Sequence, residues 1–478
     1  MAVKKAIFLN ANSDKLFEQV YDYLLERIRR GEWKAHDRLP SVRSLASEFG
    51  VHRLTVFKAY QLLKQNNQVY VKDKSGYYVQ PGSTWPPAAV QQDPIISAYV
   101  HDSHLSEIHQ VEAVYQFSKA LLDPNLLPNR YFSEYVKRVF DLYPKVLGTY
   151  STTQGDRELR EALRGYFTGR YHFELTEDEV LISSGSQEAI DLIARVLVKP
   201  RDYVILERPT YSPAIDIFTR QGANLIPTEI TPDGYCLEQI EELMRKYKPR
   251  LFYMNPTFQN PTGYTVPAEQ RKRLVDLAAE YHCLLVEDDS YPDIYFGAAP
   301  PAPFFAYDTS GHVIYIRSFS KYIAPGLSIA MVACRPGIMK YLLKAKSLTD
   351  SGTPLLNQKI FLHYFFSERM QQHLHKLRTA LSIRKDIMEE ELQSTGWQWN
   401  SPDGGFNLWI KLPGSASAGM DELLASCREQ SITFVPGSIC DPLREMNSWM
   451  RMSYSYLNEQ QLREGMRRFI GLYQDMFE

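Results

Sequence analysis

From about residue 113 onward, short apolar runs alternate with segments of helical periodicity, and this alternation constrains the fold more than any other feature of the sequence. Segments such as SQEAIDLIARVLV and AEQRKRLVDLAAEYH have the spacing of amphipathic helices. Strands that alternate with helices predict an α/β body with a largely parallel central sheet. The apolar runs that predict strands are EVLISS, YVILE, RLFYMNP, CLLVEDD, VIYIRS and IAMVAC.

Changes in composition divide the chain into modules. Residues 81–112 begin with the proline-rich stretch PGSTWPPAAVQQDP and continue without a clear pattern, so we expect a linker there. The linker separates an N-terminal module, residues 12–80, from a body that spans residues 113–478. The final part of that body, about residues 370–478, predicts a smaller α+β lobe.

Residues 12–80 predict a helix-turn-helix followed by a β-hairpin, which together make a winged helix. In LPSVRSLASEFGVHRLTVFKAYQLLKQNN, Ser41 suits a helix N-cap and Gly50 suits the tight turn, because glycine tolerates positive φ. The following VYVKDKSGYYVQ contains two β-rich runs around a turn.

We expect this module to bind double-stranded DNA, with the second helix in the major groove. Residues 1–80 hold 14 Lys and Arg against 8 Asp and Glu, a net charge of +6, whereas the remainder holds 40 against 48. The alternative is a basic face that is merely solvated. The predicted DNA-contacting residues are Arg43, His52, Arg53, Thr55, Lys58, Lys72 and Lys74.

The stretch DRLPSVRSLASEFGVHRLTV resembles the GntR-type winged helix, whose usual form is R-L-P-S-x-R-x-L-A-x-x-L-G-V-S-R-x-T-V. The chain departs from the residues usual in the family within and just after this stretch. His52 stands where serine is usual, Leu54 where asparagine or threonine is common, and Phe57 where a polar or basic residue is frequent. We therefore expect the chain to have the family's fold but to recognise a DNA site other than the commonest one of the family.

Polar residues follow several strands of the predicted body and suggest a pyridoxal phosphate site. Lys321 follows VIYIRS, and a lysine in that place can hold an aldehyde cofactor through an imine bond. Asp288 can pair with a protonated pyridine nitrogen. A phosphate would lie at Gly185, where a strand ends and a helix begins. Taken alone, each of these residues could instead be a helix cap or a solvent-exposed side chain without a role in binding.

Together these residues resemble the site of fold-type I aminotransferases, in the order glycine-serine loop, tyrosine, N-P-x-x-Q-N-P-T-G, Asp-x-x-Tyr and S-x-S-K. The resemblance implies that Tyr150 reaches the site of a neighbouring subunit and that Arg451 pairs with a substrate carboxylate, although a strand-end ion pair is the alternative for Arg451. The predicted cofactor-binding residues are Lys321, Gly185, Ser186, Gln187, Tyr211, Asn260, Asp288, Tyr291, Ser318, Ser320 and Tyr150, with Lys321 as the catalytic residue.

Two positions break the resemblance. The family pattern S-x-S-K-x-x-x-P-G-L-R-x-G has an arginine that clamps the phosphate, and this chain has Ser328 there, with Ala330 in place of the final glycine. Loss of a charge-assisted pair predicts cofactor binding weaker by about 1–3 kcal/mol, unless another basic residue fills the position.

The order winged helix, linker, aminotransferase-like body resembles the MocR subfamily of GntR-type regulators. That resemblance implies a pyridoxal-phosphate-dependent transcriptional regulator, a head-to-tail, domain-swapped homodimer, and an amino-compound effector or the cofactor itself as the signal. The alternatives are a working class I aminotransferase with an appended DNA-binding module, and a protein that senses only the cofactor.

The composition agrees with a cytoplasmic protein without a membrane span. No apolar run reaches the roughly 18 residues that a spanning helix needs. The N-terminus shows no signal-peptide core. The five cysteines are scattered without a C-x-x-C pair, so neither a metal site nor a disulfide framework is expected.

Overall fold

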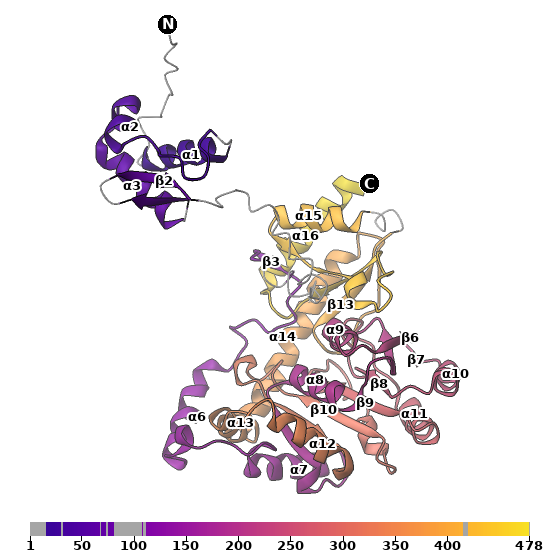
Figure 1. The fold of residues 1–478 in the computed structure, drawn as a ribbon. Helices are drawn as coiled ribbons and strands as arrows, with labels where there is room; N and C mark the ends of the chain where they lie inside the picture. Colours follow the sequence, from indigo (N-terminus) through magenta and orange to yellow (C-terminus); the bar gives the residue numbers. More distant parts are fainter. Residues whose placement is uncertain are drawn as a thin grey trace. The chain divides into compact units, whose positions relative to one another are not determined.

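The computed structural model describes residues 16–29, 32–66, 68–72, 75–80, 108, 111–413 and 419–477. Predicted Lys74 and nearly all of the predicted linker, 81–112, lie outside these residues. The chain divides into two compact units, Met1–His101 and Asp102–Glu478, and each is described by itself (Figure 1).

The N-terminal unit has the predicted helix-turn-helix and hairpin. Ser41 accepts a hydrogen bond from the backbone N–H of Ser44, and Gly50 ends the following helix with φ 67°. The second helix of the motif buries Val56, Ala59, Tyr60 and Leu63 completely. The elements are α1 (Leu16–Arg29), α2 (Val42–Phe49), α3 (Arg53–Gln65), β1 (Val69–Lys72) and β2 (Gly76–Val79).

The C-terminal unit is built on an eight-stranded sheet in the order β4-β11-β10-β9-β8-β5-β6-β7. Its centre, from β10 through β6, is parallel, while β11 runs antiparallel to both β10 and β4. The strands are β4 (Val180–Ser183), β5 (Tyr203–Arg208), β6 (Asn224–Thr231), β7 (Gly234–Tyr235), β8 (Leu251–Met254), β9 (Leu284–Asp289), β10 (Val313–Ser318) and β11 (Ala330–Ala333).

Helices cover both faces of this sheet. One apolar cluster joins α8, α9 and α12 to one face, and a larger cluster joins the other helices and the small lobe to the opposite face. The helices of the large body are α6 (Asn129–Leu142), α7 (Arg157–Tyr171), α8 (Ser186–Leu197), α9 (Ser212–Arg220), α10 (Leu237–Tyr247), α11 (Ala268–Glu280), α12 (Pro336–Ser347) and α13 (Leu355–Phe365).

The small lobe has a four-stranded sheet in the order β12-β13-β16-β15 and a parallel pair of β3 with β14. It therefore joins residues just after the predicted linker to the C-terminal end of the chain. Its elements are β3 (Tyr115–Gln116), α14 (Glu368–Leu392), β12 (Gln398–Trp399), β13 (Asn407–Lys411), α15 (Met420–Glu429), β14 (Ile432–Thr433), β15 (Val435–Pro436), β16 (Trp449–Ser453) and α16 (Glu459–Phe477).

All six predicted strands form, but the apolar runs did not indicate β6 or β7. The sequence of β6, NLIPTEIT, contains Pro227, which lacks a backbone N–H and argues against a central strand. The strand forms because β6 pairs in parallel with β5 over six residues, with Pro227 opposite Leu206. No helix in the described part of the chain is both long and apolar enough to cross a membrane.

Candidate functional site

The residues predicted after successive strands line two adjoining cavities at the carboxyl edge of the sheet. The larger, about 210 Å³, lies at the start of α8 and at the end of β10. A smaller cavity, about 10 Å³, shares Ser186, Tyr211 and Lys321 with it. The predicted residues that line one or both are Gly185, Ser186, Gln187, Tyr211, Asn260, Asp288, Tyr291, Ser318, Ser320 and Lys321.

Lys321 lies in the connection from β10 to the antiparallel β11 and lines both cavities. It is half-buried, and within the described residues its ammonium makes no hydrogen bond or ion pair. Burial lowers the pKa of Lys321 below its ordinary value, while the nearby carboxylate of Asp288 opposes that shift. A lowered pKa leaves more of the neutral amine, which is the nucleophilic form.

Asp288 is fully enclosed at the end of β9, inside the strand rather than just past it as the sequence predicted. Its carboxylate accepts hydrogen bonds from the hydroxyls of Tyr253, at 2.8 Å, and Ser290, at 3.3 Å. Burial raises the pKa of Asp288 to about 6, and these two hydrogen bonds only partly offset the effect. A cationic partner in the smaller cavity would stabilise the charged carboxylate.

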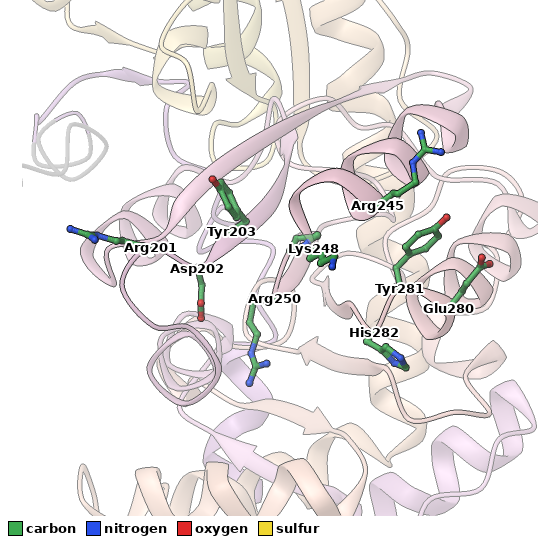
Figure 2. Close-up of a pocket in the computed structure, with 10 residues that line it drawn as sticks. Arg201, Asp202, Tyr203, Arg245, Lys248, Arg250, Glu280, Tyr281 and His282 are labelled. Atoms are coloured by element: carbon green, nitrogen blue, oxygen red, sulfur yellow. The ribbon is translucent and has the colours of Figure 1, made fainter.

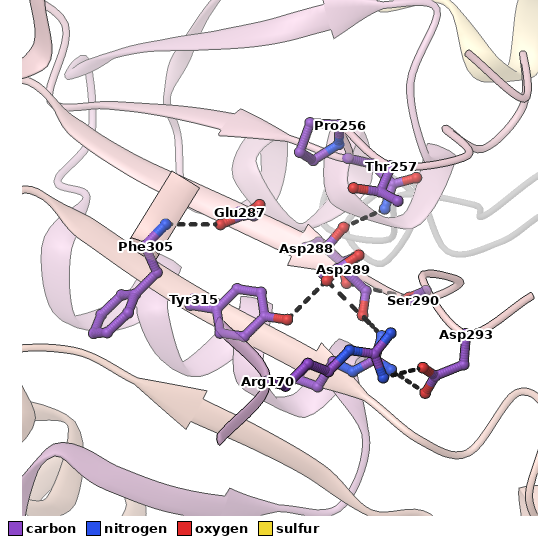
Figure 3. Close-up of polar contacts among 12 residues, drawn as sticks. Arg170, Pro256, Thr257, Glu287, Asp288, Asp289, Ser290, Asp293, Phe305 and Tyr315 are labelled. Carbon is purple, nitrogen blue, oxygen red and sulfur yellow. Dashed lines mark hydrogen bonds and ion pairs between the residues drawn. The ribbon is translucent and has the colours of Figure 1, made fainter. Parts of the chain in front are cut away.

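Three consecutive acids stand on β9, and the alternation of a strand separates them. Glu287 and Asp289 project to the opposite face from Asp288, where Glu287 accepts from the backbone N–H groups of Phe304 and Phe305 and Asp289 accepts from Tyr315 (Figure 3). Buried arginines balance that face: Arg271 beside Glu287, and Arg317 beside Asp289 and Asp293. Within the described residues, no arginine forms an ion pair with Asp288, whose carboxylate is held by Tyr253 and Ser290 instead.

Asn260 and Arg451 meet beside the smaller cavity, although they are far apart in the sequence. Nη1 of Arg451, on β16, donates to Oδ1 of Asn260 at 3.2 Å, and its Nη2 donates to the carbonyl oxygen of Ser118 at 2.6 Å. The side chain of Arg451 is buried, and its Nε has no hydrogen-bond partner. An unpartnered guanidinium N–H is costly inside a protein and suits an anionic ligand.

The start of α8 forms a concave surface suited to a phosphate. Gly185 is its N-cap with φ 95°, and a Cβ there would lie 3.2 Å from Oγ of Ser328. The first N–H groups of the helix have no carbonyl partner within it. Ser328 donates to the carbonyl oxygen of Ser184 at 2.9 Å. Lys321 is the sole cation among the described residues that line this cavity.

The residues present therefore fit pyridoxal phosphate: a half-buried free lysine, an enclosed carboxylate and a helix N-terminus line the two adjoining cavities. Arg451, with its orphaned Nε–H, contacts Asn260 beside them. Tyr150 does not converge with them in a single chain, since 85% of its surface is exposed. This exposure is compatible with the predicted reach into a neighbouring subunit.

Sequence reasoning missed the residues that hold the site residues in place. Asn255 donates to the carbonyl oxygen of Asp288 and accepts from the backbone N–H of Asn260 at 2.8 Å. Glu207, fully buried, accepts from the N–H of Asn255 and from Gln259, both at 3.0 Å. Asn255 and Gln259 belong to the N-P-x-x-Q-N-P-T-G segment, so the sequence offered a signal for them, whereas Glu207 lies on another strand, β5.

The N-terminal unit exposes most of the residues predicted to contact DNA. Arg43 on α2 and Arg53 and Lys58 on α3 are exposed, whereas Thr55 is half-buried. His52 is the N-cap of α3, and its Nδ1 accepts from the N–H of Leu54 at 3.2 Å. Lys72 lies on the hairpin, with its ammonium 4.7 Å from the ring centroid of Tyr78.

A third cavity, about 600 Å³ and larger than the other two, lies at the amino edge of the same sheet (Figure 2). It sits where α8, α10 and α11 end and β5, β8 and β9 begin. No residue predicted to bind the cofactor lines it. The charged residues that line it are Arg201, Asp202, Arg245, Lys248, Arg250 and Glu280.

Comparison with known proteins agrees with both units. The class I and II aminotransferases match residues 136–469, and the gntR family of bacterial regulatory proteins matches residues 16–79. A 2-aminoadipate transaminase of Thermus thermophilus is 32% identical over 76% of this chain and 91% of its own. An HTH-type transcriptional regulator of Bacillus subtilis, YdfD, is 29% identical over 94% of each chain.

Among solved structures, a kynurenine aminotransferase of Pyrococcus horikoshii, determined in complex with PMP, superimposes with a TM-score of 0.75. It shares 29% identity and covers 80% of this chain and 97% of its own. The predictions of a winged helix and of a fold-type I aminotransferase body are thus confirmed.

Proposed function

This chain belongs to the class I and II aminotransferase family and carries a gntR-type helix-turn-helix domain at its N-terminus, and we propose that its aminotransferase-like body senses an amino compound and controls DNA binding. It is a GntR-type regulator, and the cofactor of its body is pyridoxal 5'-phosphate. The observation that carries the proposal is the convergence of Lys321, Asp288 and Asn260 on adjoining cavities, in a chain that also has a winged helix.

When bound, pyridoxal phosphate supplies an aldehyde that reacts with amines and a ring that withdraws electrons. We assign the parts of this group to the residues as follows. Lys321, as a neutral amine, holds the aldehyde. Asp288 keeps a proton on the ring nitrogen. Asn260 and Tyr291 orient the ring hydroxyl, and Tyr211 packs against the ring.

The phosphate is held by N–H groups at the start of α8 and by hydroxyls rather than by an arginine. We assign this role to Gly185, Ser186, Gln187, Ser318 and Ser320. The neutral character of this set follows from the lining residues, among which Lys321 is the sole cation in the described part of the chain. Binding of the phosphate is consequently weaker than with a guanidinium clamp.

The effector is an amino compound with a carboxylate, which Arg451 recognises. The support is the buried Nε of Arg451, which has no partner while both of the terminal nitrogens are engaged. The active form is a head-to-tail, domain-swapped homodimer in the cytoplasm, in which Tyr150 contacts the phosphate of the neighbouring site. The high exposure of Tyr150 supports that placement.

Transamination is the second candidate function, because the lysine and the aspartate that it requires stand in the same cavities. Steady-state turnover with a panel of amino donors and keto acids separates an enzyme from a sensor. Sensing of the cofactor alone is the third candidate. Absorbance titration of the cofactor-loaded protein with amino acids decides it, since an effector that reacts changes the spectrum.

The central experiment is selection of duplexes from a random pool by the full chain, with and without pyridoxal phosphate, followed by binding measurements at several salt concentrations. We expect an enriched sequence, affinity that falls steeply with salt, and losses in Arg43→Ala and Arg53→Ala that leave cofactor loading intact. Failure to enrich any sequence would contradict the regulator, and salt-independent affinity would remove the winged helix from the mechanism.

A further inference from the structure

The outward face of α3 carries two large apolar side chains. Leu54 is 54% exposed and Phe57 is 43% exposed, whereas Val56 and Leu63 of the same helix are completely buried. Residues three and four apart lie on one face of a helix, so Leu54, Phe57 and Lys58 form one continuous outward surface. We call these three residues the reading face.

The fold of the N-terminal unit does not require apolar residues there. The core of this unit includes partly buried side chains such as Phe49, Val51 and Tyr77, but Leu54 and Phe57 do not pack against it. A leucine and a phenylalanine exposed side by side cost solubility and are typical of a surface that becomes buried in a complex.

The surroundings of the reading face indicate the chemistry of its partner. Exposed Arg53 begins the helix, and Gln61 follows the face along α3 and donates to the hydroxyl of Tyr77 at 2.9 Å. The ring Nδ1 of His52 is occupied by the N–H of Leu54, which leaves Nε2 to face outward as a donor. A partner must therefore offer acceptors and negative charge around a small apolar group.

The major groove of DNA offers that combination at one base only. Thymine presents its O4 acceptor and its C5 methyl, and no other base of the four carries an apolar group in the groove. We propose that Leu54 and Phe57 contact thymine methyl groups and so select thymine at two neighbouring base steps of the target site. This inference rests on the DNA-binding role of the winged helix proposed above.

The spacing of the two side chains fits neighbouring base steps. Three residues advance about 4.5 Å along a helix axis, and successive bases of one strand are about 3.4 Å apart. Both residues belong to the first turns of α3, the part of a recognition helix that contacts base edges. Val56, between them, faces the core and cannot take part.

Uracil tests the proposal because it differs from thymine only by the missing methyl group. Duplexes are first selected from a random pool by the full chain, and each thymine of the enriched sequence is then replaced by uracil. We expect two neighbouring positions at which uracil weakens binding about fourfold, the factor that corresponds to burial of one methyl-sized group. Uracil at other positions serves as the internal control.

Two variants assign the positions. Leu54→Ala is expected to bind thymine and uracil equally at one of them, and Phe57→Ala at the other. Arg43→Ala is the matched control: it weakens both duplexes and keeps the penalty for uracil, because its contact is to phosphate. The arm with the unaltered chain needs no variant, so a variant that fails to fold does not obscure the result.

An enriched sequence without any penalty for uracil would overturn the inference and leave the regulator intact. Failure to enrich a sequence would overturn the regulator itself. Loss of self-association in Leu54→Ala and Phe57→Ala, measured by sedimentation, with the uracil penalty unchanged, would show that the reading face binds another copy of the chain and would also overturn the inference.

Discussion

The cavities at the two opposite edges of the main sheet differ in the chemical groups that they bring together, and neither their volumes nor their charges predict this difference. The amino-edge cavity, about 600 Å³, is larger than the carboxyl-edge cavity, about 210 Å³, and has more cations around it. Of the two edges, the carboxyl edge is the one whose adjoining cavities bring together a free lysine, an enclosed carboxylate and a helix N-terminus. The two edges differ in whether their ionisable groups are exposed to solvent or buried.

At the amino edge, helices end, so their free carbonyls carry partial negative charge. Cations are favourable there for structural reasons. Arg245 stands in the last turn of α10, and Nε of Arg250 donates to the carbonyl oxygen of Leu197 at the end of α8. Both side chains are exposed to solvent.

At the carboxyl edge, the helix α8 begins, Asp288 is enclosed and Lys321 is half-buried. Burial lowers the pKa of Lys321 and raises that of Asp288 to about 6, which moves both toward physiological pH. Perturbed groups that share a cavity are typical of functional sites. Desolvation, rather than formal charge, therefore distinguishes the carboxyl edge, where we propose the cofactor binds, from the amino edge.

The largest difference between the two edges is expected when the lysine at each is removed. Lys321→Ala should abolish covalent attachment of pyridoxal phosphate, detected as the imine absorbance and as trapping by borohydride. Lys248→Ala at the amino edge should leave both signals unchanged. An unaltered imine band in Lys321→Ala would place the covalent bond on another residue.

The carboxylate at the carboxyl edge gives the next largest effect. Because its pKa is about 6, Asp288 is protonated in acid and must lose that proton to pair with the ring nitrogen. Cofactor affinity should therefore fall as pH drops through about 6, with Asp288 contributing up to about tenfold per pH unit.

Asp288→Asn should weaken binding by about 1.5–3 kcal/mol at neutral pH and flatten this part of the profile, measured by equilibrium titration from pH 5 to 8. Asp202→Asn at the amino edge serves as the matched control. An identical profile for Asp288→Asn and the unaltered chain would exclude pairing with the ring.

Replacement of the missing clamp tests the neutral phosphate surface. Ser328→Arg should tighten cofactor binding by about 1–2 kcal/mol, because a charge-assisted bond to phosphate would be added beside Gly185. Titration of both proteins measures the change. Weaker binding would indicate that a basic residue already fills the position, and absence of the imine in both proteins would contradict cofactor binding altogether.

The smallest effect belongs to the amino edge. Arg245→Gln removes a cation from the last turn of α10 and should lower the free energy of unfolding by about 0.3–1 kcal/mol, with cofactor affinity unchanged. Chemical denaturation and cofactor titration measure the two quantities. A loss of cofactor affinity would mean that the two edges are coupled.

The sequence predicted the winged helix and the strand ends because both depend on local patterns. The positions buried on α3, the N-cap Ser41 and the turn at Gly50 follow from spacing and backbone preference. The same reasoning missed β6, whose Pro227 argued against a strand that only pairing with β5 explains. Local sequence signals are sufficient where the residue spacing within an element already indicates its secondary structure.

The sequence by itself determined two modules and the order of the chemical groups along the chain, since burial periodicity and turn residues are encoded over short distances. Only the tertiary structure decided that Arg451 of the small lobe meets Asn260 and that Asn255 joins Asn260 to Asp288. Such contacts depend on the sheet order β4-β11-β10-β9-β8-β5, which crossover connections and the burial of two helix-covered faces fix over the whole body, and which no short window of sequence contains.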